Sequence, residues 1–453
     1  MRHRSIAATV ASLTAFTVTT FAIPATAVAA DGQSSQYIVQ FKPGADRGAV
    51  LRSLGTRLGV VLTDQRELAV GAHVITANRR TAGLLAALQA QGQVEYAEPD
   101  IQMYPLSTPN DPNYPQQWHY FEPTGGLNLP GAWDLATGTG VVVAVLDTGK
   151  TSHPDLDGNW VGGYDFISNS TAARDGNGRD SNPQDQGDWY LAGECGQATG
   201  SNSSWHGTHV AGTVAALGNN GVGVAGVAYN ARVLPVRVLG KCGGTSADIA
   251  DAIVWASGGS VAGVPANPNP AKVINLSLGG SGSCSNTYRR AINSANNRGT
   301  TVVVAAGNSN ANASAFTPAN CAGVVTVAAL DRSGNRAFYS NFGTTIEVSA
   351  PGGEVRLETD PPGTRSTPEN GVLSTLNAGT TTPGTPNYWT YMGTSMAAPH
   401  VAGLVALMLS KNSTLTPSQV LAALQANARP VPGICTGGCG AGLVDAAATV
   451  AAV

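Results

Sequence analysis

The sequence is poor in charged residues, which make up only 12 % of its 453 positions, against 42 % hydrophobic residues. A chain with this balance can bury a large core, which excludes an intrinsically disordered protein. The formal net charge is −3, so nothing favours nucleic acid as a partner. Beyond residue 30, no stretch reaches membrane-spanning length without a glycine, a proline or a charge. We therefore expect a soluble mature protein with no membrane partner.

Cysteine is scarce as well, and this limits the kinds of site the chain can build. No C-x-x-C pair or histidine-spaced partner is present, which disfavours a zinc site. An even number of cysteines favours disulfides in an exported protein, but spacing alone does not choose among the possible pairings. The six residues are Cys195, Cys242, Cys284, Cys321, Cys435 and Cys439.

The first thirty residues differ from the rest of the chain. Arg2 and Arg4 precede an apolar stretch over residues 6–23, and Pro24 and an alanine-rich A-x-A ending follow it. A basic start, a short apolar core and small residues at the end are typical of a secretory signal peptide. A membrane anchor, the alternative, would need about 20 apolar residues and a stop-transfer flank, which this run lacks. We predict a signal peptide over residues 1–30 and an extracellular protein.

The rest of the chain has two parts. Residues 36–42 and 94–101 alternate like strands and residues 79–91 carry a helical leucine pattern, which predicts a small α+β unit before a junction rich in Pro and Asn at 105–115. Beyond it, apolar strands alternate with helical patterns. This alternation predicts an α/β fold with a doubly wound, mostly parallel sheet and helices on both faces. The predicted strands are 141–146, 233–239, 273–278, 301–306 and 324–329, and the predicted helices are 207–217, 246–257, 287–297, 395–409 and 417–427.

Four segments carry the chemistry. They are V-V-V-A-V-L-D-T-G at 141–149, H-G-T-H-V-A-G-T at 206–213, A-A-G-N-S at 305–309 and G-T-S-M-A-A-P-H at 393–400. Each is ambiguous alone, because an Asp after a strand often caps a turn and a Ser before a helix is usually an N-cap. Together, in the order Asp147, His206 and Ser395, they resemble the subtilisin-like serine proteases, or subtilases. The resemblance covers about residues 110–450.

The resemblance implies a role for each residue in a serine endopeptidase. Ser395 would be the nucleophile, His206 the general base and Asp147 the group that orients the imidazole. Asn308 and the backbone N–H of Ser395 would bind the oxyanion. His153, His209 and His400 compete for the base, but His209 and His400 lie inside predicted helices and are expected to be structural. The strand that pairs with an extended peptide would be Ser277, Leu278 and Gly279, and the first specificity pocket would be lined by Ala305, Ala306 and Gly307, with Phe316 near its base.

The same resemblance divides the chain into a signal peptide (1–30), an inhibitory propeptide (31–106) and a peptidase domain (107–453). A plain accessory domain is the alternative reading of the middle part. Self-processing is expected between Tyr104 and Thr108, which makes the protein a zymogen whose partners are protein or peptide substrates and its own propeptide. We expect a monomer. The chain ends soon after the family's usual terminal helix, so no further C-terminal domain is expected.

Calcium is the expected cofactor, as a structural ion. The family's strong site corresponds to Asp155, Asn220 and the carbonyls of Leu217, Val222 and Val224, with Asp111 as a further oxygen ligand. Gly218 is an extra residue in this loop. A second candidate is the acidic run 175–188, where a solvated acidic loop is the alternative reading. Its aspartates are Asp175, Asp180, Asp185 and Asp188.

In the context of the family, we expect disulfides 195–242, 284–321 and 435–439. Two rival functions remain: a non-catalytic binding module of the same fold, and a hydrolase of esters or small amides. A non-catalytic binding module would lack one of the four residues of the predicted active site, and all four are present. A hydrolase of esters or small amides would not need a strand that pairs with a peptide. The chain has no G-x-S-x-G elbow, which disfavours an α/β-hydrolase.

Overall fold

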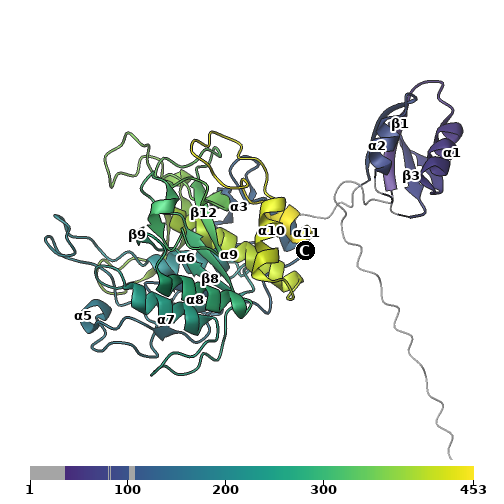
Figure 1. Ribbon diagram of the computed structural model, residues 1–453. Helices are drawn as coiled ribbons and strands as arrows, with labels where there is room; N and C mark the ends of the chain where they lie inside the picture. Colours follow the sequence, from purple (N-terminus) through teal and green to yellow (C-terminus); the bar gives the residue numbers. More distant parts are fainter. Residues whose placement is uncertain (1–35, 80, 82, 101–107) are drawn as a thin grey trace, which may run out of the picture. The chain divides into compact units, whose positions relative to one another are not determined.

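The computed structural model describes residues 36–79, 81, 83–100 and 108–453 (Figure 1). The chain divides into two compact units, Met1–Ile101 and Gln102–Val453. The predicted signal peptide lies outside the described residues, and so does most of the expected processing region.

The first unit is an antiparallel sheet with two helices. Its strand order is β2-β3-β1-β4, and residues of both helices share one core with alternate residues of β1, namely Tyr37, Val39 and Phe41. The structure therefore confirms an α+β unit, although the sequence reading found only β1, α2 and β4. The elements are β1 (Gln36–Phe41), α1 (Arg47–Leu58), β2 (Leu62–Glu67), β3 (His73–Ala77), α2 (Leu84–Gln89) and β4 (Val94–Pro99).

The second unit is built on a parallel sheet of seven strands in the order β13-β12-β10-β8-β5-β7-β6. All its strand pairs are parallel, as the alternation of strands and helices predicts. The five predicted strands are present, and the structure adds the short β6 and the edge strand β13. The strands are β5 (Val142–Asp147), β6 (Tyr164–Asp165), β7 (Arg232–Arg237), β8 (Val273–Leu276), β10 (Thr301–Ala305), β12 (Val324–Leu330) and β13 (Val348–Pro351).

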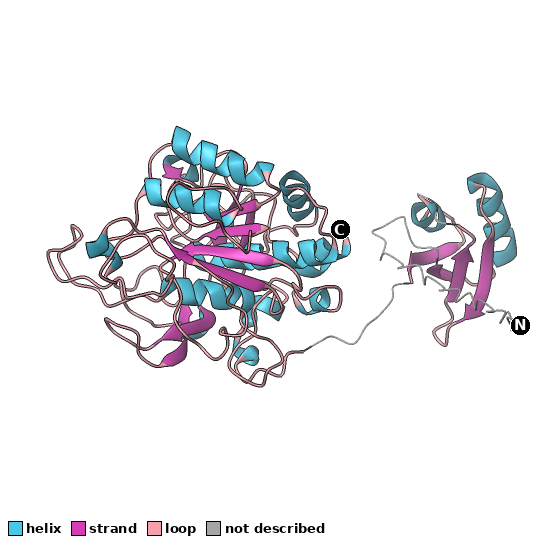
Figure 2. Cartoon of the chain, turned by 90° about the horizontal axis from the view of Figure 1, so that it is seen from below, coloured by secondary structure: helices cyan, strands magenta, loops and turns pink. Residues whose placement is uncertain are grey.

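Helices cover both faces of this sheet (Figure 2). Along β5, Val143 and Val145 belong to the core that contains α6, α9 and α10, whereas Ala144 and Leu146 belong to the core that contains α7 and α8. This alternation follows from the two-residue period of a strand and explains why every residue of β5 before Asp147 is apolar. The helices are α6 (His206–Ala215), α7 (Ser246–Ala256), α8 (Asn286–Asn297), α9 (Thr394–Lys411), α10 (Pro417–Ala426) and α11 (Ala446–Ala451).

Several smaller elements complete this unit. The pair of β9 and β11 and the hairpin of β14 and β15 are antiparallel. The sequence reading did not predict either pair. The bounds are α3 (Trp118–Phe121), α4 (Pro130–Trp133), α5 (Ser170–Ala173), β9 (Gly280–Ser281), β11 (Phe316–Thr317), β14 (Val372–Asn377) and β15 (Pro386–Tyr391), with single 3-10 turns η1 (Tyr114–Gln116), η2 (Ala313–Ala315) and η3 (Pro368–Asn370).

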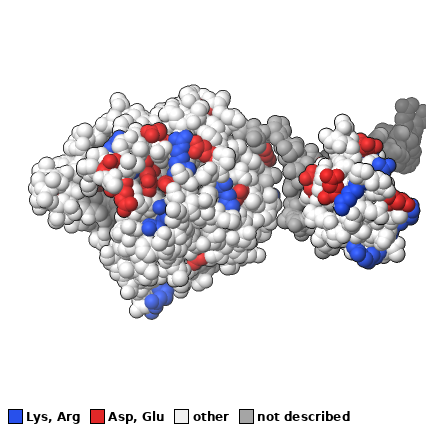
Figure 3. Space-filling view, turned by 90° about the horizontal axis from the view of Figure 1, so that it is seen from above, with Lys and Arg blue, Asp and Glu red and all other residues white. Residues whose placement is uncertain are grey.

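Three disulfides tie surface loops of the second unit together. They join Cys195 to Cys242, Cys284 to Cys321 and Cys435 to Cys439, which is the pairing expected from the sequence. None of the helices in the described part of the chain has the length and apolar character to cross a membrane. On the face seen in Figure 3, charged side chains are sparse and both signs are interspersed.

Candidate active site

The last residue of the interior strand β5 places a carboxylate at the carboxyl edge of the sheet. Asp147 is fully buried, and its Oδ1 accepts a hydrogen bond from the Thr148 backbone N–H at 2.8 Å. The Nδ1 atom of His206 lies 2.8 Å and 2.9 Å from the two carboxylate oxygens. A carboxylate can only accept, so Nδ1 carries the proton and Nε2 is left as an acceptor. The pair therefore fixes the tautomer of His206.

The backbone around His206 explains how α6 approaches β5 so closely. A Cβ on Gly207 would lie 3.1 Å from the Gly149 backbone N and 3.2 Å from Asp147 Cβ, so only glycine fits. Trp205, just before the helix, adopts a left-handed conformation with φ 49°. Such a conformation costs a non-glycine residue about 1 kcal/mol. The buried indole, whose Nε1 donates to Gly379 O at 2.6 Å, holds it in place.

The electrostatic environment separates His206 from the competing histidines. Burial alone would lower its pKa, but the charge and hydrogen bond of Asp147, with smaller effects of Asp188 and Asp185, raise it above 6.5. Burial lowers the pKa of His209 to about 3 and that of His400 to about 4. Their hydrogen-bond partners are a Trp389 carbonyl for His209, and His119 and a Met396 carbonyl for His400. His153 bonds to an Asn387 carbonyl, so none of the three faces a carboxylate as His206 does.

Ser395 lies at the start of the long helix α9. Its Oγ donates to the Ser277 carbonyl at 3.2 Å, at the long end of the hydrogen-bond range. In the other direction, Ser277 Oγ donates to the Ser395 carbonyl at 2.8 Å, and Asn275 Nδ2 donates to Ser277 Oγ at 2.9 Å. These contacts fix the first turn of α9 against β8, while the weak bond of the Ser395 hydroxyl leaves it free to rotate.

Two hydrogen-bond donors face one small space beside Ser395. Asn308 Oδ1 accepts from the backbone N–H and the hydroxyl of Thr394, both at 2.9 Å, which turns its Nδ2 the other way. A Cβ on Gly393 would lie 3.5 Å from Asn308 Nδ2 and also 3.5 Å from the Ser395 backbone N. The missing side chain of Gly393 thus leaves room between two donors at a helix N-terminus, an arrangement suited to an anion. Thr394 is a residue that the sequence reading missed, and the G-T-S motif that contains it was the available signal.

Two cavities open along the segment 277–281. One, of about 380 Å³, is lined by Ser395 and Asn308. The other, of about 700 Å³, is lined by His206. Among the described residues, no backbone hydrogen bond involves Leu278 or Gly279, so this edge is open to an extended peptide. The smaller cavity brings together all the predicted substrate-binding residues, Ser277, Leu278, Gly279, Ala305, Ala306 and Gly307, and Phe316 as well.

The residues of the first predicted calcium site also come together. Asp111 and Asp155 are buried, and no ion-pair partner of either is found in the described part of the chain. Burial raises the pKa of Asp155 to about 6 and also raises that of Asp111. Asn220 Nδ2 donates to Asp155 Oδ1 at 2.7 Å. Within the described residues, no donor reaches the carbonyl oxygens of Leu217, Val222 and Val224.

The four aspartates of the second predicted site do not come together. Among the described residues, no group of three or more His, Cys, Asp or Glu side chains could hold a metal ion. Asp175 bonds to the buried guanidinium of Arg237, Asp180 to Asn177, Asp185 to the Gly187 N–H and Asp188 to Ser204. These four side chains therefore do not form one cation site in the described part of the chain.

Comparisons with known proteins agree with the geometry. The sequence profile of the subtilase family matches residues 138–442. An extracellular protease of Xanthomonas campestris is 51 % identical, and the match spans 100 % of this chain and 80 % of the relative. An extracellular basic protease of Dichelobacter nodosus is 43 % identical over 89 % of this chain and 64 % of its own length. A solved protease structure from Pseudoalteromonas arctica superposes with a TM-score of 0.73 at 59 % identity and covers 76 % of this chain and 99 % of its own.

The histidines provide a direct test of this electrostatic description. We expect the NMR signals of His206 to titrate above pH 6.5, and those of His209 and His400 near pH 3 and 4. Since unfolded histidine binds protons below about pH 6.5, the stability that His209 and His400 contribute is present above that pH and is lost as the pH falls toward 4 and 3. Asp147→Asn should lower the pKa of His206, whereas Asp157→Asn, at an exposed carboxylate, should not. A His206 that titrates below pH 6.5 would contradict this account.

Proposed function

Because this chain belongs to the subtilase family of serine proteases, we propose that Asp147, His206 and Ser395 are the triad with which it cleaves peptide bonds. The observation that carries the assignment is the hydrogen bond of His206 Nδ1 to the buried Asp147 carboxylate, at the same sheet edge as the N-terminus of α9. A structural histidine does not need such a partner, as His209 and His400 demonstrate.

The chemistry follows from the donors and acceptors at this edge. Ser395 Oγ attacks the scissile carbonyl carbon while His206 Nε2 takes its proton, and Asp147 stabilises the imidazolium. Asn308 Nδ2 and the Ser395 N–H bind the oxyanion of the tetrahedral intermediate. His206 then gives the proton to the leaving amine, the C–N bond breaks, and an acyl ester on Ser395 remains. Water, deprotonated by His206, hydrolyses this ester and restores the Ser395 hydroxyl.

Substrates would bind mainly through their backbone. The free edge at Ser277, Leu278 and Gly279 can pair with an extended peptide as an added strand. The cavity lined by Ala305 and Gly307 would take the side chain just before the cleaved bond. Backbone pairing is tolerant of sequence, so protein chains rather than small esters are the natural substrates.

We further propose that the protein is exported as a zymogen with an inhibitory propeptide, residues 31–106. Residues 36–100 contain a compact unit with its own core, separate from the peptidase unit. The Xanthomonas relative, which is named an extracellular protease, matches the full length of this chain. The signal-like start of the sequence fits the same pathway.

A structural calcium ion fits the cluster around Asp155. Two buried carboxylates without a cationic partner and carbonyl oxygens without a donor are the oxygen ligands that Ca²⁺ prefers. The ligands would come from Asp111, Asp155, Asn220 and the carbonyls of Leu217, Val222 and Val224. The ion would neutralise the buried charge and hold the loop after α6 against the N-terminal part of this unit.

The triad is tested by hydrolysis of casein and of a chromogenic peptide. Ser395→Ala should abolish turnover, because no other nucleophile is activated by His206. Asn308→Ala should lower kcat by about 10²–10³-fold with a smaller change in KM, because the oxyanion contact forms only in the transition state. Ser418→Ala, in α10, is a matched control that should keep full activity. Full activity in Ser395→Ala would refute the nucleophile assignment.

Processing is tested on the secreted full-length protein. Mass spectrometry should find a mature N-terminus between Tyr104 and Thr108 in the wild type and the uncleaved precursor in Ser395→Ala. The separately added propeptide should inhibit the mature enzyme. A mature protein that begins near residue 31 would contradict the proposal.

Calcium is tested by thermal unfolding in the Ser395→Ala background, which prevents self-digestion. Excess chelator should lower the melting midpoint by about 5 °C, since loss of a saturating ligand removes about 3 kcal/mol of stability. Asp155→Asn should remove the response to the chelator, and Asp157→Asn should keep it. An equal midpoint with and without chelator would exclude the ion.

A further inference from the structure

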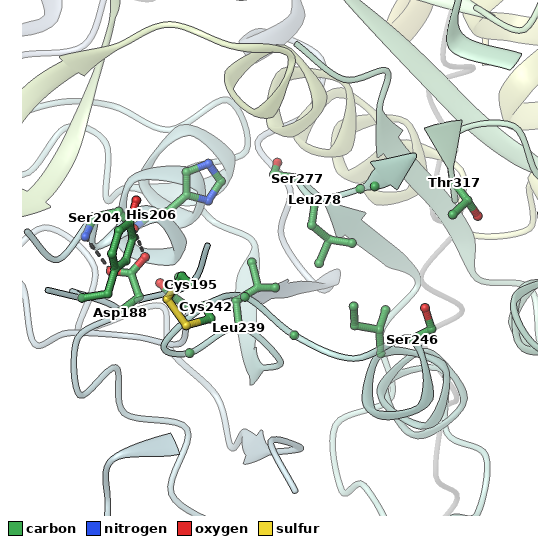
Figure 4. Close-up of a pocket in the computed structure, with 18 of the residues that line it drawn as sticks. Asp188, Cys195, Ser204, His206, Leu239, Cys242, Ser246, Ser277, Leu278 and Thr317 are labelled. Atoms are coloured by element: carbon green, nitrogen blue, oxygen red, sulfur yellow. Dashed lines mark hydrogen bonds between the residues drawn. A yellow bond between two sulfur atoms is a disulfide. The ribbon is translucent and has the colours of Figure 1, made fainter. Parts of the chain in front are cut away.

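The larger of the two cavities extends the cleft beyond His206 and has both apolar and polar walls (Figure 4). Its apolar lining includes Leu239, Ile249 and Tyr288. Next to His206, the wall is formed by Asp188 and Ser204. Ser277 and Leu278 lie along the cavity, so it continues the path of the peptide edge that begins at Ser395.

Of the described residues that line this cavity, Asp188 alone is acidic, and none is Lys or Arg. The carboxylate is half-buried, and within the described residues no ion pair to it is found. Arg174 lies nearby, but its guanidinium stacks on Trp189 and its Nη1 donates to the Gly187 carbonyl. Arg174 is therefore close enough for its charge to interact with that of Asp188, but it makes no direct ion pair, and the Asp188 carboxylate faces the cleft.

The carboxylate is also held in one orientation. Its Oδ1 accepts the Ser204 N–H at 2.6 Å and its Oδ2 accepts the Ser204 hydroxyl at 2.7 Å. Ser204 is fixed in turn, because its carbonyl accepts from Tyr391 Oη at 2.8 Å. The disulfide between Cys195 and Cys242 ties the loop after Asp188 to the same wall. Each carboxylate oxygen keeps a free lone pair, so Asp188 can accept further hydrogen bonds from a bound cation.

The direction of an extended peptide decides which of its side chains meets Asp188. The residue before the cleaved bond places its side chain in the smaller cavity with Ser395. Successive side chains of a strand point to opposite sides, so the side chain of the preceding residue turns away from that cavity. The other cavity along the same edge is lined by His206 and Asp188, so this second residue before the cleaved bond is the one that would meet Asp188.

We propose that Asp188 is a specificity residue that selects Lys or Arg at the second position before the cleaved bond. The inference rests on the proposed function, because it needs Ser395 as the nucleophile. Neither the pattern of the acidic run nor its spacing could reveal this role, since the loop must fold back onto His206 before Asp188 reaches the cleft.

The test compares peptides that differ only at this position, carrying Lys, Gln or Glu. For the wild type we expect kcat/KM to be about tenfold higher for Lys than for Gln, as a charge-assisted hydrogen bond provides, and lowest for Glu. In Asp188→Asn, the ratio of kcat/KM for the Lys peptide to that for the Gln peptide should be close to one. Comparing two peptides at one pH cancels any effect of the variant on His206 in the free enzyme, because that effect is common to both peptides. Glu194→Gln is the matched control, because Glu194 lies in the same loop but is paired with Lys241, and it should keep the wild-type ratio.

A second measurement does not depend on the variant folding. In the wild type, the preference for Lys over Gln should weaken as salt is raised, because ions screen a partly exposed pair. The proposal would be overturned if the ratio of kcat/KM for the Lys peptide to that for the Gln peptide were the same in the wild type and in Asp188→Asn. It would also be overturned if Glu194→Gln lowered this ratio as much as Asp188→Asn does, or if salt did not change the ratio in the wild type. If Ser395→Ala cleaved the peptides, the proposed function itself would fail. If the wild type needs Ser395 but cleaves all three peptides equally, only the role of Asp188 fails.

Discussion

The rest of the site depends on one buried carboxylate. Asp147 has no access to water, and an unpaired ionised carboxylate in that position would cost several kcal/mol. The Thr148 N–H and His206 Nδ1 meet this need. The hydrogen bond to Asp147 therefore holds His206 in the tautomer with the proton on Nδ1. Nε2 is left as an acceptor, and no other group is needed to fix this state. Since Asp147 ends β5, which pairs with a strand on each side, the sheet fixes the position of His206. Helix α6 can begin there only because Gly207 has no side chain.

The sequence predicts the central part of the fold because burial on two faces leaves a strong signal. The residues 142–146 and 302–305 are apolar throughout, as expected for strands between two layers of helices. The edge strand β13 and the two-residue β6 were missed, because a short edge strand has no such pattern. The hairpin of β14 and β15 was missed as well, because its strands do not alternate between apolar and polar residues, although β15 carries the carbonyls that accept hydrogen bonds from His153 and His209.

The site was predictable to the extent that its residues stand in local motifs. Asp147, His206, Asn308 and Ser395 each lie within a recognisable segment, and Thr394, which turns the Asn308 amide, lies within the last one. Asp188 is different. It was predicted as a calcium ligand because it belongs to an acidic run, yet the four aspartates have separate partners and only Asp188 lines the cleft beside His206. The position of Asp188 depends on its hydrogen bonds to Ser204 and on the disulfide that joins Cys195 of the same loop to Cys242, 47 positions further along the chain. No local sequence pattern contains these contacts.

The acid at Asp188 affects both the substrate and the base, and the two effects are linked. Asp188 helps to raise the pKa of His206, and a base with a raised pKa is protonated over a wider pH range and cannot accept the Ser395 proton there. A substrate cation bound to Asp188 would offset this charge and return His206 toward the neutral form. A basic substrate side chain at that position would thus bind Asp188 and also favour the neutral form of His206, whereas a neutral side chain would do neither. An acidic loop so close to the triad is therefore compatible with catalysis when the substrate brings the compensating charge.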